Sequence, residues 1–354
     1  MVEQVDVLCV GLGPAGASAA AEAARRGLRV VAVDRRREAG RPVQCAEFVP
    51  ALIGVEVGHL GPAVRQAIAA MVTFVESDAP DVQPDFRGTM LDRARFDALL
   101  VERAVAAGAT CRFGATVRDV AGDGRVTLSN GDVARPRVLI GADGPRSIVG
   151  EAIGSRNVAL VETRQVTAPL VAAHEATDIF LSDAIPGGYG WLFPKGDVAN
   201  IGAGVVPRAR AELKPIVERL HRSLVEAGRV GRQVLALTGG LIPVGGMVAP
   251  RGVLATTQVL LAGDAAGLAN PVTGAGIAAA VYSGKLAGEA ASAVIAGDAN
   301  AADDYADELE TVFGASLARA LRRRQELAAD AGRPRARHAA LRRGWIAYPE
   351  YWAA

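Results

Sequence analysis

VDVLCVGLGPAG, residues 5–16, is the stretch that decides the fold of the first part of the chain. Residues 5–10 form a nearly continuous apolar run, which is typical of a strand buried on both faces of a parallel sheet. An alanine-rich helix is expected over residues 14–26 and is stopped by the next glycine. A second strand over residues 28–33 ends at Asp34. The sequence therefore predicts a complete β-α-β unit.

The three glycines of this stretch have the spacing of a dinucleotide-binding turn. Gly11 permits the tight turn, Gly13 lets the backbone approach a pyrophosphate, and Gly16 lets the helix sit close to the strand. The helix N-terminus adds free N–H groups and partial positive charge. Asp34 lies about 20 residues further on, where a carboxylate can accept hydrogen bonds from an adenosine ribose. The predicted nucleotide contacts of this unit are Gly11, Gly13, Pro14, Ala15, Gly16, Asp34 and Arg35.

Two later strands also run into glycine-bearing pieces. Residues 138–140 lead into Gly141-Ala142-Asp143-Gly144, and residues 259–262 lead into Gly263-Asp264. Gly274-Ala275-Gly276 then opens a long helix of small residues. Asp264 can accept from the ribityl hydroxyls of a flavin, and the helix N-terminus can stabilise the negative charge of a reduced ring. Asp143-Gly144 alone is an ordinary turn, but the pieces together predict one FAD site. Its further contacts are Asp143, Gly144, Gly263, Asp264, Gly274, Ala275 and Gly276.

In this order the three motifs resemble the FAD-dependent oxidoreductases of the para-hydroxybenzoate hydroxylase fold, over most of residues 1–300. Leu91-Asp92-Arg93-Ala94-Arg95-Phe96-Asp97 resembles the segment that opens the helix before the third strand of that fold, which implies a flavin contact from Arg93. Arg95 fits a solvated helix face equally well. Val117 is included among the predicted cofactor contacts. No second strand-GxGxxG-helix unit occurs, so NAD(P)H or another reductant is expected to act as a transient electron donor.

Two insertions break the α/β rhythm between the flavin pieces. Residues 72–75 and 86–91 have strand character, residues 157–205 contain several short β-like runs, and residues 211–227 form an amphipathic helix. We therefore expect a mixed fold, α/β plus α+β, with a Rossmann-like FAD-binding domain, an inserted antiparallel-sheet substrate domain and C-terminal helices. The expected ranges are 1–70, 88–152 and 252–300 for the first domain, 71–87 and 153–251 for the second, and 301–354 for the C-terminal segment.

Tyr189, Trp191 and Phe193 alternate along one predicted strand. Alternation puts all three rings on one face, where they form either a packed core or the wall of a substrate cavity. The segment, followed by Gly202-Ala203-Gly204, is similar to the Tyr-x-Trp-x-Phe-Pro and Gly-x-Gly pattern of the geranylgeranyl reductase family. That resemblance implies substrate contacts from the three aromatic residues.

Arg41-Pro42-Val43-Gln44-Cys45-Ala46-Glu47-Phe48 resembles a second segment of the same family. The resemblance implies that Cys45 lies near flavin and substrate. We expect Cys45 and Ala46 to contact the cofactor and Glu47 the substrate, with Cys45 and Tyr189 as candidate catalytic residues. Many family members carry glycines after the cysteine, whereas this chain has Ala46 and Glu47. Cys45 can equally be a small buried hydrophobic residue.

Composition narrows the remaining choices. With 354 residues, the chain is longer than the roughly 250–300 residues over which a single hydrophobic core keeps growing, so two lobes are expected. The net charge of +1 gives no reason to expect a nucleic-acid partner. Three dispersed cysteines lack metal-ligand spacing and suit a reducing compartment. No stretch reads as a signal peptide or membrane span, so we expect a cytoplasmic chain. The arginine-rich end with Trp345, Tyr348, Tyr351 and Trp352 suits a peripheral membrane contact, a solvated tail or a docking segment.

These features favour an FAD-dependent reductase that saturates carbon-carbon double bonds of an isoprenoid. The expected partners are a hydrophobic small molecule or lipid and, as electron source, a reduced nicotinamide or a donor protein. An aromatic hydroxylase is the second interpretation, because one fold hosts several chemistries. A quinone-linked electron-transfer flavoprotein is the third, although three dispersed cysteines cannot ligate an iron-sulfur cluster.

Overall fold

A predominantly parallel sheet forms one end of the molecule in the computed structural model, which describes residues 2–51, 61–329 and 337–353. Its strand order is β17-β18-β11-β1-β2-β8, with β10 and β9 attached beside β11. The pairs β1–β2, β1–β11, β11–β18 and β2–β8 are parallel. Its strands are β1 (Val2–Val10), β2 (Val30–Asp34), β8 (Thr110–Phe113), β9 (Val117–Val120), β10 (Val126–Leu128), β11 (Val133–Gly141), β17 (Arg251–Leu254) and β18 (Thr257–Leu261).

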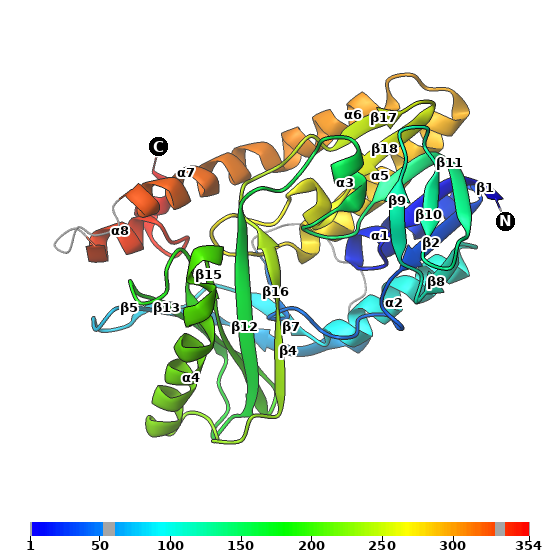
Figure 1. Cartoon of the computed structure of the whole chain (residues 1–354). Helices are drawn as coiled ribbons and strands as arrows, with labels where there is room; N and C mark the ends of the chain where they lie inside the picture. Colours follow the sequence, from blue (N-terminus) through cyan, green and yellow to red (C-terminus); the bar gives the residue numbers. More distant parts are fainter. Residues whose placement is uncertain (1, 52–60, 330–336, 354) are drawn as a thin grey trace.

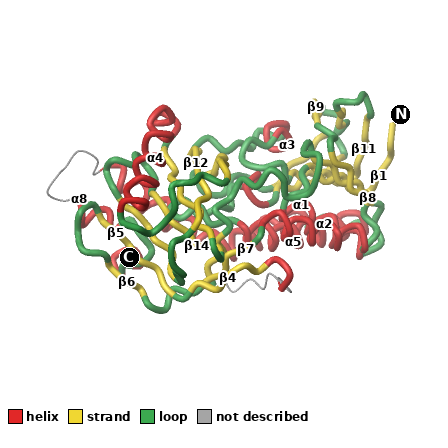
Figure 2. Tube along the Cα trace, turned by 90° about the horizontal axis from the view of Figure 1, so that it is seen from below, coloured by secondary structure: helices red, strands yellow, loops and turns green. Residues whose placement is uncertain are grey.

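Three helices lie side by side along this sheet: α1 (Pro14–Arg25), α2 (Arg93–Ala106) and α5 (Ile277–Ala296) (Figures 1 and 2). Glycines on α5 let it approach α1 closely. A Cβ added to Gly284 would lie 2.1 Å from the carbonyl oxygen of Ala15, and one added to Gly288 would lie 2.7 Å from that of Ala19. This close contact fixes the N-termini of both helices at the same edge of the sheet.

A second, seven-stranded sheet forms the other lobe, in the order β16-β12-β15-β14-β13-β5-β6. Most neighbours are antiparallel, but β13 pairs with β5 in parallel. Helix α4 (Arg210–Glu226) covers one face and buries Leu213, Ile216, Val217 and Leu224. The strands are β5 (Ala70–Val75), β6 (Asp81–Gln83), β12 (Leu160–Pro169), β13 (Ala176–Leu181), β14 (Gly190–Lys195), β15 (Val198–Val205) and β16 (Ala236–Pro243).

A small third sheet has the strand order β3-β7-β4, and its strands come in the sequence between strands of the two large sheets. It consists of β3 (Phe48–Pro50), β4 (Val64–Ile68) and β7 (Gly88–Leu91). The sequence predicted only β7 of this sheet, within residues 86–91, and missed β4 because residues 64–68 carry no clear alternation of apolar and polar side chains. It anchors the end of the loop that carries Cys45. The short helices elsewhere are α3 (Ile148–Ala152), η1 (Gly61–Ala63), η2 (Pro207–Ala209) and η3 (Gly263–Ala266).

The chain ends in helices that cross from the first lobe to the second (Figure 1). These are α6 (Ala301–Leu309), the π-helical turn η4 (Glu310–Gly314), α7 (Ala315–Ala329), α8 (Arg337–Arg343) and α9 (Pro349–Trp352). The expected mixed fold is confirmed, and the predicted strands and helices occur with ends shifted by a few residues. Within the described ranges, no helix is long and apolar enough to cross a membrane.

The aromatic residues at this end are mostly buried. Trp345, Tyr348 and Tyr351 are buried, whereas Trp352 is about half exposed. Peripheral membrane contact of this end stays a prediction. Trp345 and Tyr348 pack in one core cluster with residues of β5 and β13. The segment is therefore docked on the second sheet, the alternative that its arginines and aromatics also allowed.

Candidate active site

The three glycine-bearing pieces meet where β1, β11 and β18 end side by side. Gly11 has a φ of +99°, and a Cβ there would lie 2.2 Å from the carbonyl oxygen of Ala142. Its N–H donates to Val33 O at 2.8 Å, which ties the turn to β2 as well. Gly11 is therefore required both by its backbone conformation and by the neighbouring turn.

Gly13 and Gly16 differ in what surrounds them. A Cβ on Gly16 would fall 1.8 Å from the carbonyl oxygen of Gly11, so this glycine lets α1 close on its own turn. A Cβ on Gly13 would have only a terminal nitrogen of Arg36 nearby, at 3.9 Å. Gly13 thus faces open space at the start of α1, where backbone N–H groups can approach a phosphate. Pro14 and Ala15 line a cavity that begins at this turn and extends between the two lobes.

Asp34 lies at the end of β2 and accepts four hydrogen bonds from protein groups. Its Oδ2 accepts from Leu12 N–H at 2.8 Å, and Arg36 donates to it through Nη2 at 2.8 Å. Burial alone would raise the pKa of Asp34, but the bonds from Arg36 outweigh it and hold that pKa below its usual value. Asp34 and Arg35 both line the cavity, and their contact with a cofactor stays a prediction. Arg36, which the sequence analysis did not single out, stands between Asp34 and Gly13.

Asp143 serves mainly to shape its own turn. Its carboxylate accepts from Ser147 Oγ at 2.5 Å and from Ile148 N–H at 2.7 Å, at the start of α3. Burial raises the pKa of Asp143 despite these bonds. Gly144 follows with a φ of +88°, so the turn presents backbone to the cavity that both residues line.

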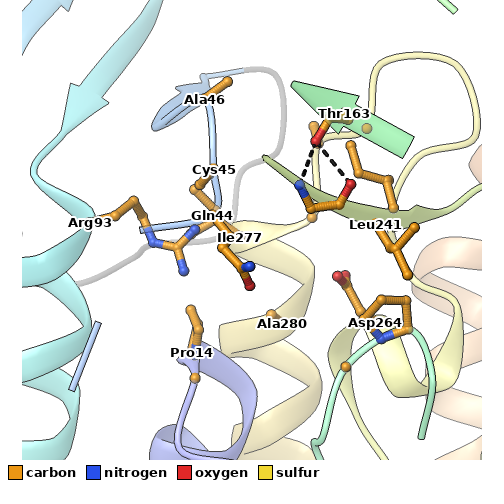
Figure 3. Close-up of a pocket in the computed structure, with 18 of the residues that line it drawn as sticks. Pro14, Gln44, Cys45, Ala46, Arg93, Thr163, Leu241, Asp264, Ile277 and Ala280 are labelled. Carbon is orange, nitrogen blue, oxygen red and sulfur yellow. Dashed lines mark hydrogen bonds between the residues drawn. The ribbon is translucent and has the colours of Figure 1, made fainter. Parts of the chain in front are cut away.

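Asp264 points into the cavity from the turn after β18 (Figure 3). No described residue hydrogen-bonds to its carboxylate, and burial raises its pKa to about 6, against the opposing charge of Arg93. Gly274, Ala275 and Gly276 lie beside it and lead into α5, and a Cβ on Gly276 would come 3.3 Å from Asp264 Oδ1. A buried carboxylate without a partner next to a helix N-terminus suits a ligand with hydroxyl donors and an anionic edge.

Arg93 and Cys45 meet at the first turn of α2. Arg93 donates from Nε to Asp97 Oδ1 at 3.0 Å, and its guanidinium is directed toward Cys45 and Gln44 (Figure 3). Burial would lower the pKa of Arg93, but Asp97 and Cys45 keep it above its ordinary value. The Cys45 sulfur accepts from Glu47 N–H at 3.2 Å. Cys45, Ala46 and Arg93 all line the cavity.

Glu47 joins the two lobes. Its φ is +70°, a conformation that favours glycine, and its carboxylate is buried. Oε1 accepts from Arg93 N–H at 3.0 Å, while Oε2 accepts from Lys195 Nζ at 2.6 Å and Asn200 Nδ2 at 3.0 Å. Glu47 lines the cavity, but its three bonds commit both oxygens to protein donors. Substrate contact from its side chain remains a prediction.

Tyr189, Trp191 and Phe193 line the cavity and also pack in a core cluster, so both readings of their alternation apply. Tyr189 and Trp191 have ring centroids 5.7 Å apart, and Trp191 stacks on Phe193 at 6.1 Å. The Tyr189 hydroxyl donates to Thr273 O at 2.6 Å, and burial with nearby Cys45 raises its pKa. The rings form a continuous wall beside Cys45.

All the predicted cofactor contacts except Gly16 and Gly263 line one cavity of about 510 Å³, which runs between the lobes. Gly16 and Gly263 instead support the turns: Gly263 has a φ of +61° and lies against Ala15 and Ala280. The open face of Gly13, the unpartnered Asp264 and the α5 N-terminus suit groups that FAD contains, namely phosphates, hydroxyl donors and an anionic ring edge. The residues present therefore suit the cofactor.

Several lining residues escaped the sequence analysis. Gln165 on β12 receives the Trp191 indole N–H at 3.0 Å and donates to Cys45 O at 3.3 Å. Thr163 holds Gly240 of β16 through two hydrogen bonds (Figure 3). The only sequence signal for β16 is the glycine pair in its middle. Further lining residues that were missed are Phe48, Met71, Phe86, Ile179, Leu241, Ile242, Trp345 and Ile346.

Comparison with known proteins agrees with this geometry. Residues 161–242 match the family described as the geranylgeranyl reductase catalytic domain, and residues 6–170 match the lycopene cyclase protein family. The digeranylgeranylglycerophospholipid reductase of Methanocella arvoryzae is 33% identical over 340 residues, covering 90% of this chain and 86% of the relative. The reductase of that name from Methanosarcina acetivorans is 31% identical over 310 residues, covering 82% and 75%.

Solved structures show the same fold. The geranylgeranyl bacteriochlorophyll reductase-like protein of Thermoplasma acidophilum superposes with a TM-score of 0.80 at 26% identity, covering 93% of this chain and 88% of that one. PqsL of Pseudomonas aeruginosa, described as a probable FAD-dependent monooxygenase, gives 0.71 at 21% identity, with 96% and 99% covered, and shows the fold alone. With its glycine pieces, aromatic wall and these relatives, the chain belongs to the geranylgeranyl reductase family of FAD-dependent oxidoreductases.

Proposed function

We propose that this enzyme saturates carbon-carbon double bonds of a geranylgeranyl-type lipid. The observation that carries the proposal is the aromatic wall of Tyr189, Trp191 and Phe193, which faces the cavity beside the residues suited to the flavin. The names of its relatives support the same substrate class. A flat, apolar wall suits an isoprenoid chain, because rings bury alkene and methyl groups without demanding hydrogen bonds.

The reaction adds a hydride to one alkene carbon and a proton to the other. FAD, when bound and reduced, supplies the hydride from its N5 position, and a reduced nicotinamide or a donor protein restores the two electrons. The chain's own part is to place the alkene, exclude water and supply the proton. Aromatic residues on β14 position the chain, and the apolar lining keeps charge development away from bulk water.

Cys45 and Tyr189 are the two proposed proton sources on this wall. Both side chains carry a transferable proton and both line the cavity. The Tyr189 proton is engaged with Thr273 O at 2.6 Å, and the raised pKa of the phenol makes it a weaker acid. The Cys45 sulfur accepts from Glu47 N–H and lies beside the Arg93 guanidinium, and no hydrogen bond from its own S–H to a described residue is found. The geometry therefore favours Cys45 as the donor.

Anaerobic photoreduction tests this function. The purified holoenzyme is photoreduced and mixed with a geranylgeranyl lipid, with the fully saturated lipid as control. Flavin absorbance should return only with the unsaturated lipid, and mass spectrometry should show added hydrogen. If no prenyl alkene reoxidises the flavin, the proposal fails. Oxygen-dependent consumption of reduced nicotinamide with a small aromatic would instead favour a hydroxylase, and reoxidation by quinone analogues alone would favour electron transfer.

A further inference from the structure

The C-terminal segment, residues 337–352, reaches into the cavity from the end opposite the N-terminal sheet. Helix α8 and the C-terminus lie far from β1 in both views of the molecule (Figures 1 and 2). Trp345 and Ile346, just after α8, are nevertheless among the cavity's lining residues. The cavity thus extends from the glycine turns of the first lobe to this terminal segment.

Trp345 closes the cavity across the face of the second sheet. Its ring centroid lies 4.7 Å from that of Tyr189, at an interplanar angle of 57°. On its other side the indole N–H lies 3.3 Å from the sulfur of Met71 on β5. Strand β13 runs between β14 and β5, and its Ile179 lines the same space. The indole therefore lies between Tyr189, which directly precedes β14, and Met71 on β5, and Trp345 is 3% exposed.

One buried arginine and two partly exposed polar contacts hold the segment that carries this indole. Arg323 on α7 is 5% exposed and donates to the carbonyl oxygens of Tyr351 at 3.1 Å and Glu350 at 2.9 Å. Arg342 pairs with Asp78 at 2.9 Å. The Tyr348 hydroxyl donates to Asp81 at 2.7 Å. These hydrogen bonds lie on both sides of Trp345 in the chain and attach the segment to α7, to the turn between β5 and β6 and to the start of β6.

We propose that Trp345 is the end wall that sets the length of isoprenoid chain the enzyme accepts. The inference rests on the proposed function, because it assigns a specificity-determining position within that substrate site. An apolar chain can extend along the aromatic wall until it meets the indole. A longer chain must displace a buried ring, whereas a shorter one leaves apolar surface uncovered. Trimming Trp345 should lengthen the preferred chain, and enlarging its neighbour Ile346 should shorten it.

Two variants with opposite expected shifts test this wall. Trp345→Phe keeps an aromatic contact with Tyr189 but frees space, and Ile346→Trp fills it. The holoenzymes are assayed with geraniol, farnesol, geranylgeraniol and geranylfarnesol, and kcat/KM is compared along the series. We expect Trp345→Phe to shift the ratio of kcat/KM for geranylfarnesol over geranylgeraniol upward by about tenfold, and Ile346→Trp to shift it downward. Glu350→Ala, on the same segment but with an exposed side chain outside the cavity lining, should leave the ratio unchanged.

A binding measurement separates this inference from the proposed function. Saturated n-alkyl alcohols of increasing length are titrated into each holoenzyme, and the perturbation of the flavin spectrum reports binding without turnover. Trp345→Phe should bind longer alcohols than the wild type, and Ile346→Trp only shorter ones. If no alkene is turned over but the binding cut-off shifts, the reductase assignment fails and the end wall stands. An unchanged cut-off and an unchanged kcat/KM profile in both variants, with FAD retained, overturn the end wall.

Discussion

At the nucleotide end of the cavity, Gly11, Gly13 and Gly274 present backbone to the ligand, whereas at the substrate end Tyr189, Trp191 and Trp345 present rings. The first arrangement depends on where a Cβ is missing, and the second on which large side chains meet. Backbone N–H groups bind any pyrophosphate alike, so this end can be common to many enzymes. A wall of side chains can be reshaped one residue at a time, so this end is where the substrate is chosen.

The largest effect at the nucleotide end is expected from adding one methyl group at Gly16 or at Gly13. Gly16→Ala places a Cβ 1.8 Å from the carbonyl oxygen of Gly11, so the apoprotein should lose about 4 kcal/mol of unfolding free energy and should no longer bind FAD. Gly13→Ala meets only open space. Its apoprotein should stay within about 1 kcal/mol of the wild type, while FAD affinity falls about tenfold or more. Denaturant unfolding and FAD titration of the apoproteins measure both. Equal stability losses in the two variants would contradict the distinction.

The same contrast explains what could be predicted from the sequence. The glycine turns depend on residues a few positions apart, so their spacing was enough to place Gly11, Gly13 and Gly16. The substrate end brings together segments that are far apart: Phe48, Met71, Trp191 and Trp345. Arg323 and Asp81 bind Tyr351 and Tyr348, which lie near Trp345 in the chain. No local sequence pattern predicts these long-range contacts. Likewise, nothing in the sequence showed that Glu47 adopts a positive φ.

Glu47 and Lys195 connect the two ends, and a double-mutant cycle measures that connection. Glu47→Ala leaves Lys195, Asn200 and the Arg93 N–H without their acceptor, so unfolding free energy should fall by about 3 kcal/mol. Glu47→Gln keeps an acceptor and should lose about 1 kcal/mol. Combining Glu47→Gln with Lys195→Met should cost less than the sum of the single changes, because the pair interacts directly. Strict additivity would show that the contact does not couple the lobes.

Asp264 allows a test through pH, because its carboxylate is buried at the nucleotide end and accepts no hydrogen bond from the residues that the structure describes. Its pKa is raised to about 6, so the folded apoprotein keeps a proton that the unfolded chain releases near its ordinary value of 3.8. The unfolding free energy of the apoprotein should therefore fall as pH rises from about 4 through 6, by about 3 kcal/mol in total. In Asp264→Asn this fall should disappear. Denaturant unfolding across that range measures it.

Asp34 provides a matched control of opposite sign for this pH series. Arg36 lowers its pKa in the folded state, so its contribution is present above the ordinary pKa and is lost as pH falls. Removing the carboxylate in Asp34→Asn should therefore weaken the protein at neutral pH but not in acid. If the unfolding free energy of Asp264→Asn changes with pH as that of the wild type does, burial does not raise the pKa of Asp264.

The smallest effect is expected for Tyr189→Phe, which keeps the ring of the aromatic wall and removes only the hydroxyl. Thr273 O then loses its donor, so unfolding free energy should fall by about 1 kcal/mol. The rate of alkene-dependent flavin reoxidation should change less than about tenfold, because the tyrosine proton is already committed to that carbonyl, whereas Cys45→Ala should lower it by about 100-fold. Rapid mixing of photoreduced variants with a geranylgeranyl lipid measures both rates. The reverse ranking would make Tyr189 the proton donor and would turn this part of the wall from a binding surface into catalytic machinery.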